Sequence, residues 1–290
     1  MTKPPPVFQH LGPYAEHGAV ADCCRLTERV WLAYLDLAGA HEHKNKESRE
    51  FLIVRMLYIA EIMSSAVRLN ASWGMTPAAM SLLRDRYEQT LRFSWLVRNP
   101  DPLAFEKYDR TKFSKMSDLT RSTTNQTREY FEKLLGPLPA WATEAPTKEQ
   151  RAFFEEWSRL DLRSMGKKRD EFPPSADAAI AKEKLGRLYD SIYAQFSSVS
   201  HYDRFSIDFM MLNKIADGRM VLGAQPHWPG LLILENAHFD IIQCFEAAQV
   251  CHERDAVAIF DGFFQEWLGI ANAIAPSVEA VLNAATDQPA

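Results

Sequence analysis

The most regular pattern of hydrophobic and polar positions in this chain runs from Thr76 to Arg98. Apolar side chains recur there every three or four residues, which is the spacing of one face of an α-helix. That face consists of Met80, Leu83, Tyr87, Leu91 and Trp95. Thr76 suits an N-cap with Pro77 after it, and Asn99-Pro100 suits a helix end. The pattern therefore predicts a helix over residues 76–98.

Arg84 and Glu88 fall one turn apart inside this apolar stripe. Their position predicts a buried ion pair. Burying two charges costs several kcal/mol per ion unless their partners are supplied, so such a pair needs a reason. It can lock neighbouring helices in register, which is the more common case, or it can belong to a functional site.

Helical spacing also predicts helices over residues 16–43, 50–71, 176–201, 231–252 and 260–282, the last interrupted near Pro276. The segment 50–71 is apolar nearly all round, which is typical of a helix in the middle of a bundle. Gly74 breaks the chain before residue 76, so these two helices are expected to form an antiparallel hairpin. Between Phe209 and Gln225, Asp217-Gly218 separates two apolar runs, a pattern that fits one small β-hairpin.

These elements predict an all-α protein, a multi-helix bundle with a long inserted helical segment. Residues 16–285 are expected to form a single helical domain, preceded by a flexible tail over 1–15 and followed by a disordered tail over 286–290. The segment 101–175 is expected to be a peripheral helical excursion, because its background is polar. Proline-rich stretches at 136–146 and 166–175 read as linkers within it.

Composition narrows the class of protein. The chain has 290 residues, of which 47% are hydrophobic, and a net charge of -5. No apolar run approaches the roughly 20 residues that a membrane span requires, and the N-terminus lacks the features of a signal peptide, so a cytoplasmic protein is expected. The four cysteines have no metal-binding spacing and read as core residues. The negative charge argues against a protein that coats nucleic acid, although local basic patches remain open.

The polar end of the predicted helix 176–201 carries the main candidate chemistry. Tyr193, Ser197 and His201 fall on one flank there, with Arg204 close behind. His201 could serve as a general acid or base, and Arg84 or Arg204 could stabilise phosphate charge. The alternative is structural, since a histidine at a helix C-terminus can cap the last carbonyls.

A metal site is a further alternative. Glu235 and His238 form a Glu-x-x-His motif like those of carboxylate-bridged di-iron proteins, which need two such motifs. The sequence has one. Glu61, Glu88 and His201 could still converge with it on a metal, but a single motif arises easily by chance. We therefore expect no metal and no cofactor.

Two stretches resemble a helical bacterial family, domain of unknown function 5677. The first is L-x-R-x-x-x-E at 82–88 with the aromatic and aliphatic run that follows it, and the second is Tyr193 followed by serines and His201. The resemblance implies that Arg84, Glu88, Ser197 and His201 are the characteristic polar positions. The family is loosely similar to HEPN domains, where an Arg and a His form a metal-independent RNA-cleaving site in a dimer. This chain lacks the Arg four to six residues before His201.

Two functions follow as hypotheses. The first is a regulatory or binding module in which Arg84, Glu88 and His201 form a buried polar cluster. The alternative is a ribonuclease-like hydrolase that uses His201 with an Arg, and whether the protein is an enzyme stays open. The expected ligand class is RNA or a nucleotide, and a homodimer is consistent with the resemblance.

Overall fold

The computed structural model describes residues 11–16, 18–39, 49–105, 161–200, 212–214, 220–222, 227–251 and 255–286, and the single positions 108, 129, 133 and 148. These residues form a bundle of long α-helices, which confirms the predicted all-α fold class. The α-helices are α1 (Gly18–Gly39), α2 (Arg49–Ser72), α3 (Thr76–Arg98), α8 (Leu162–Glu171), α9 (Gln195–Ser200), α11 (His227–Cys251) and α12 (Asp255–Thr286). Short helical turns are η1 (Pro13–Glu16), η2 (Ile180–Lys182) and the π-helical η3 (Tyr189–Ala194).

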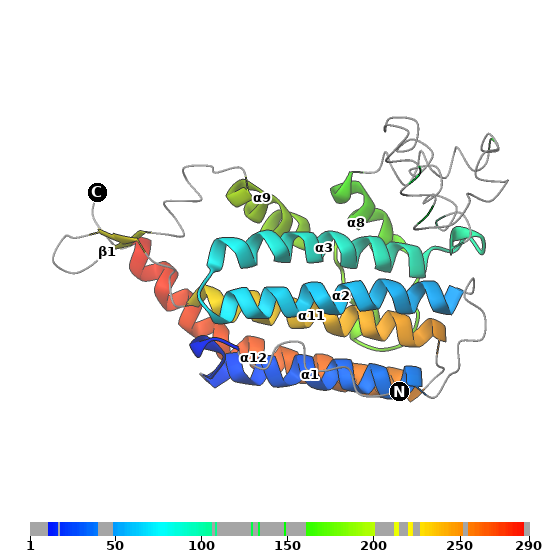
Figure 1. The fold of residues 1–290 in the computed structure, drawn as a ribbon, viewed down its shortest axis with the longest axis horizontal. Coiled ribbons are helices and arrows are strands. Elements are labelled where there is room, and N and C mark those ends of the chain that lie inside the picture. The colour runs from blue at the N-terminus through cyan, green and yellow to red at the C-terminus, as the bar shows by residue number, and fades with distance from the viewer. Residues whose placement is uncertain are drawn as a thin grey trace.

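Helix α11 occupies the centre of the bundle. It packs against α1, α2, α3 and α12, while α8 and α9 lie on the far side of α3 (Figure 1). Every residue from 236 to 248 is buried. The sequence predicted instead that residues 50–71 would lie in the middle. Helix α2 is an outer helix, and its side facing away from α11 is exposed.

The predicted hairpin of α2 and α3 is confirmed, and the turn between them has a clear physical cause. Gly74 adopts a left-handed backbone with φ of 72°, which a side chain would disfavour. The amide of Gly74 donates to the carbonyl of Ala71 at 2.9 Å, and that of Met75 donates to Asn70 at 2.8 Å. This is a Schellman cap, which ends α2. Helix α3 begins at Thr76, so Met75 and not Thr76 holds the cap position.

The chain between residues 161 and 200 differs from the prediction. Residues 162–171 form α8, although 166–175 was interpreted as a linker. Asp161 caps this helix by accepting the amide of Ser164 at 2.8 Å, and the helix ends before Pro173-Pro174. The predicted continuous helix 176–201 is broken into η2, η3 and α9. Hydrophobic spacing alone did not reveal these breaks.

Two further expectations concern the C-terminal third. Strands β1 (Leu212–Lys214) and β2 (Met220–Leu222) pair antiparallel, as the predicted hairpin requires. Helix α12 continues through Pro276, where an interruption was expected. Much of the predicted excursion 101–175 lies outside the described residues, as do the site residues His201 and Arg204.

A fully buried ion pair joins α3 to α11. The guanidinium of Arg86 donates to the Oδ1 atom of Asp240 at 2.7 Å, and both side chains are 0% exposed. The other oxygen of Asp240 accepts the hydroxyl of Ser64 on α2 at 2.5 Å. Asn236 donates to the same hydroxyl at 2.8 Å. Burial lowers the pKa of Arg86 and raises that of Asp240, so each ion depends on the other for its charge.

The predicted buried pair of Arg84 and Glu88 is therefore wrong. Both side chains are half-buried, and Glu88 accepts Arg92 at 2.9 Å instead. The buried face of α3 is centred closer to Arg86 than the sequence pattern indicated. The ion pair that joins α3 to α11 is formed by Arg86, two residues after Arg84.

All four cysteines are free thiols, and Cys23, Cys24 and Cys244 are buried as predicted, while Cys251 is half-buried. Burial raises the pKa of Cys23 to about 12 and that of Cys24 to about 11, and it raises the pKa of Cys244 well above its ordinary value. Cys251 has a pKa raised to about 12. Only the thiolate reacts readily with alkylating reagents.

The native thiols should therefore resist iodoacetamide at pH 8, because a pKa of about 11 to 12 leaves almost no thiolate. Unfolding returns each pKa to about 8.5 and should expose all four thiols. Mass spectrometry before and after denaturation measures the difference. Rapid labelling of Cys23 in the native protein would contradict this packing.

Asp240→Ala should lower the free energy of unfolding by about 3–5 kcal/mol, because it leaves the guanidinium of Arg86 buried without its partner. Glu88→Ala is the matched control and should cost less than about 1 kcal/mol, because its pair with Arg92 is partly open to solvent. Chemical denaturation measures both. The double change Arg86→Met with Asp240→Leu should recover much of the loss, because neither charge is then buried. Equal effects of Asp240→Ala and Glu88→Ala would contradict the assignment.

Candidate functional site

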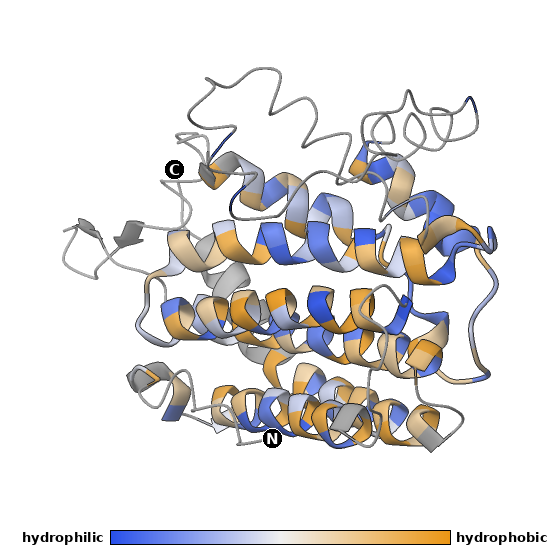
Figure 2. Ribbon diagram, turned by 45° about the vertical axis from the view of Figure 1, so that its right-hand side comes forward, coloured by the Kyte–Doolittle hydropathy of each residue, from blue (hydrophilic) through white to orange (hydrophobic). Residues whose placement is uncertain are grey.

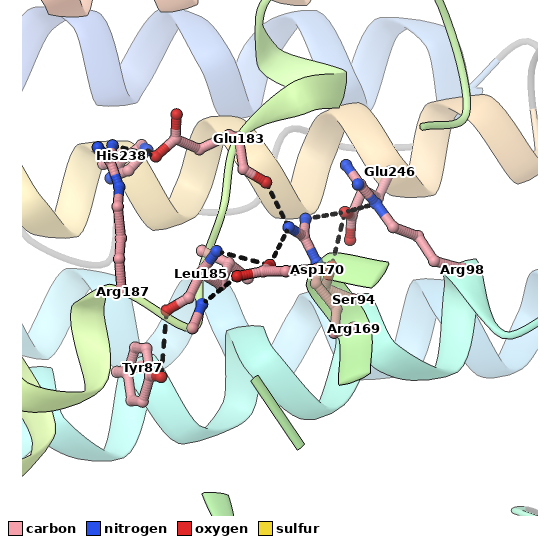
Figure 3. A network of polar contacts seen from close by, with 11 residues as sticks. Tyr87, Ser94, Arg98, Arg169, Asp170, Glu183, Leu185, Arg187, His238 and Glu246 are labelled. Carbon is pink, nitrogen blue, oxygen red and sulfur yellow. Dashed lines mark hydrogen bonds and ion pairs between the residues drawn. The ribbon is translucent and has the colours of Figure 1, made fainter. Parts of the chain in front are cut away.

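A network of polar contacts joins α3, α8 and α11 beside the ion pair (Figure 3). The Oε1 atom of Glu246 accepts Ser94 at 2.7 Å, Arg98 at 2.7 Å and Arg169 at 2.8 Å. Glu246 and Arg169 are 0% exposed and Arg98 is 4% exposed. Burial lowers the pKa of Arg98, and Glu246 opposes that shift. One carboxylate thus holds two arginines inside the bundle.

Asp170 extends this network to the turn at residues 185–186. It accepts Arg169 at 3.1 Å, the amide of Leu185 at 3.0 Å and the amide of Gly186 at 2.8 Å. Arg169 also donates to the carbonyl of Glu183. With Asp170 included, two carboxylates balance two guanidinium groups, so the cluster is neutral. Such charge balance is typical of a structural network.

Two glycines allow the turn to reach α8. A Cβ on Gly166 would lie 2.7 Å from the Cα atom of Gly186, so the two backbones touch where side chains cannot fit. The hydroxyl of Tyr87 donates to the carbonyl of Leu185 at 3.2 Å and ties the same turn to α3. The network therefore fixes where η3 starts, directly beside α3.

The η3 turn presents two tyrosines to the flank of α3 that carries Arg84. The rings of Tyr189 and Tyr193 stack with centroids 5.2 Å apart. The guanidinium of Arg84 lies 5.0 Å from the centroid of Tyr193, and that of Arg163 lies 5.8 Å from the centroid of Tyr189. We call these four residues the arginine–tyrosine array. Single π-helical turns such as η3 occur often at functional sites.

Arg84 differs from the buried arginines in its partners. Its guanidinium reaches the hydroxyl of Tyr193 at 3.5 Å, and its buried Nε atom has no acceptor. Among the residues that the structure describes, Arg84 forms no ion pair. A half-buried cation with an unsatisfied donor can accept an anionic group from a ligand.

The other predicted site residues are less connected. Glu88 lies one turn from Arg84 but is paired with Arg92. Ser197 is half-buried on α9, one turn after Tyr193, and α9 packs against α3. His201 and Arg204 lie outside the described residues, so their distance from Arg84 stays a prediction.

Among the described residues, the Glu-x-x-His motif of α11 has no neighbours that would complete a metal site. Glu235 lies 3.6 Å from the Nδ1 atom of His238, while Glu183 lies 3.9 Å from the Nε2 atom on another edge of the ring. The imidazole stacks on Trp267 with centroids 4.2 Å apart. In the part of the chain that the structure describes, no three His, Cys, Asp or Glu side chains gather where they could hold a metal ion.

The charged residues of the core were not among the predicted site residues. A usable signal was present, because Arg86, Thr90, Ser94 and Arg98 repeat every four residues along α3. A matching polar stripe, Asn236, Asp240, Gln243 and Glu246, interrupts the apolar helix α11. Two such stripes on helices that must pack together predict charge pairs between them. Arg163 and the stacking of Tyr189 had no comparable signal.

None of the described helices is both long enough and apolar enough to cross a bilayer. Neither the curated proteins nor the solved structures contain a match to the chain. A distant similarity to HEPN domains finds no support in these comparisons.

One family model does match. It covers residues 51–217 and is described as a family of unknown function (DUF5677). The matched segment contains most of α2 and all of α3, α8, η3 and α9, and with them all four residues of the arginine–tyrosine array. Because the match spans more than half of the 290 residues, the protein belongs to this family, DUF5677.

Proposed function

We propose that this protein is a helical binding module for an anionic ligand, and that the arginine–tyrosine array is its binding surface. The single observation that carries the proposal is that Arg84, among the described residues, forms no ion pair and directs its guanidinium to the hydroxyl and ring of Tyr193. The buried arginines of the bundle each contact a carboxylate. A phosphate oxygen is a partner of the right charge for Arg84.

The tyrosines support single-stranded RNA or a nucleotide as the ligand class. The ring of Tyr189 stacks on the ring of Tyr193. The guanidinium of Arg163 lies 5.8 Å from the centroid of the Tyr189 ring. Arg163 also forms an ion pair with Asp190, and the two side chains are 56% and 68% exposed. Such an exposed pair holds Arg163 over the tyrosine ring only weakly. A base that displaced Arg163 would stack on the ring of Tyr189.

The net charge of the chain is consistent with a ligand that contacts only a small binding site. A chain with a net charge of -5 does not attract a long nucleic acid over its whole surface. With one or two phosphates bound at Arg84 and Arg163, the logarithm of affinity should fall with the logarithm of salt concentration with a slope of about -0.7 to -1.4. A slope several times steeper would point to another, larger basic surface.

Fluorescence anisotropy with a labelled 12-nucleotide single-stranded RNA, and with ATP as a competitor, tests the proposal. Tyr189→Leu should weaken binding about 5- to 150-fold, the range for loss of one base stack. Arg84→Gln should weaken binding to a similar degree. Arg25→Gln removes the same charge on α1, where Arg25 is exposed and paired with Asp22, and should change nothing. If neither RNA nor ATP binds, or if Arg84→Gln binds like the native protein, the proposal is wrong.

The same samples distinguish binding from catalysis. Cleavage of the RNA without added metal, abolished by His201→Ala while binding persists, would favour the hydrolase reading with His201 as acid or base and Arg204 near the phosphate. Intact RNA after prolonged incubation would leave the chain a binding module. Glu88 and Ser197 are proposed as neighbours of the ligand in either case, because they lie one turn from Arg84 and Tyr193.

A further inference from the structure

The outward side of α2 is apolar along most of its length. Tyr58, Ile59 and Ile62 are 65%, 55% and 44% exposed, and Trp73 just beyond the helix is also exposed. Among the exposed residues of α2 after Arg49, Arg55 alone carries a charge. In Figure 2 orange stretches alternate with blue ones along the helices in the middle of the molecule, where Figure 1 places α2. An outer helix that is apolar nearly all round lacks the polar face that water would favour.

Helix α1 extends this surface. Arg68 of α2 lies 4.0 Å from Glu28 of α1, and the two helices run antiparallel (Figure 1). Leu32 and Leu35 follow Glu28 by one and two helical turns, so they lie on the same flank of α1 as this contact. Leu32 and Leu35 are 55% and 43% exposed. We call Leu32, Leu35, Tyr58, Ile59, Ile62 and Trp73 the α1–α2 apolar face.

The size of this face suits a protein interface. A buried aromatic side chain covers about 150–250 Å², so six large side chains that are each about half exposed present on the order of 500 Å². The largest apolar patch of an ordinary monomer is about 300–600 Å² and is often functional. Two copies in contact would bury about 1,000 Å² from these side chains before any rim is counted, which is the area a specific interface must reach.

The charges at the edge indicate which partner fits. Arg55 and Glu61 stand three residues before and three residues after Tyr58. A two-fold axis at Tyr58 sets α2 antiparallel to its copy and brings Arg55 of each molecule level with Glu61 of the other. The two-fold axis would therefore form the contact between Arg55 and Glu61 twice. A surface whose charges complement themselves in this way favours a second copy over an unrelated protein.

We propose that the α1–α2 apolar face is the interface of a two-fold homodimer, centred on Tyr58, in which α2 packs antiparallel against α2 of the second copy. The array of Arg84 lies on the other side of α3, next to η3 and α9, so dimer formation leaves it open. The inference does not depend on the proposed ligand.

Sedimentation velocity on the full chain between about 1 and 100 µM tests the oligomeric state. The native protein should have twice the mass of one 33.1 kDa chain. Ile59→Glu places a charge in the apolar face and should raise the dissociation constant of the dimer at least about 30-fold, as for a hot-spot residue. Ile259→Glu is the matched control, because Ile259 is 40% exposed on α12 outside the face, and it should stay dimeric. A native protein that is monomeric at 100 µM overturns the proposal.

Two further variants locate the axis. Tyr58→Cys should form an intermolecular disulfide under mild oxidation, because the axis places residue 58 beside its own copy, whereas Ile259→Cys should not. Arg55→Glu and Glu61→Arg should each weaken the dimer, and the double variant should restore it. A dimer that persists in Ile59→Glu and gives no Tyr58→Cys cross-link would place the interface elsewhere. Far-UV circular dichroism of each variant checks that the fold is intact.

Discussion

The ion pair between Arg86 and Asp240 is the contact on which the packing of α2, α3 and α11 depends. Each charge is removed from water, so neither is tolerable without the other. The second oxygen of Asp240 is satisfied by Ser64, which brings α2 into the same arrangement. A shift of one helix by one turn would separate these atoms by about 5 Å. The pair therefore selects one register among several that apolar packing alone would permit.

Charge balance separates the buried polar network from Arg84, which forms no ion pair among the described residues. Glu246, Asp170, Arg98 and Arg169 balance in charge and share their hydrogen bonds inside the bundle. Arg84 is half-buried and faces an aromatic ring. The network and Arg84 are linked mechanically, because Asp170 holds the turn from which η3 starts and η3 carries Tyr193. The charge-balanced network thus positions the turn that carries the candidate site.

The family match ends before α11, the helix that supplies carboxylates to the buried arginines. The matched segment, residues 51–217, contains Arg86, Arg98 and Arg169, while the carboxylates of Asp240 and Glu246 lie beyond it on α11. Without α11, Arg86 and Arg98 would lose their anionic partners and Arg169 would keep only Asp170. The smallest unit that can fold with these side chains buried therefore includes α11, whatever the extent of the sequence similarity.

The sequence by itself determined the helical class and most helix positions, because a period of 3.6 residues and local stop signals act within one element. Thr76–Arg98, the turn at Gly74 and the small hairpin were all accessible in this way. It could not determine which polar flank of α3 is buried. Arg84 with Glu88 and Arg86 with Thr90 both repeat at helical spacing, and the choice depends on where α11 presents Asp240. The broken segment 176–201 and the burial of Arg169 on α8 have the same origin. They follow from contacts between residues far apart in the chain, which only the tertiary structure decides.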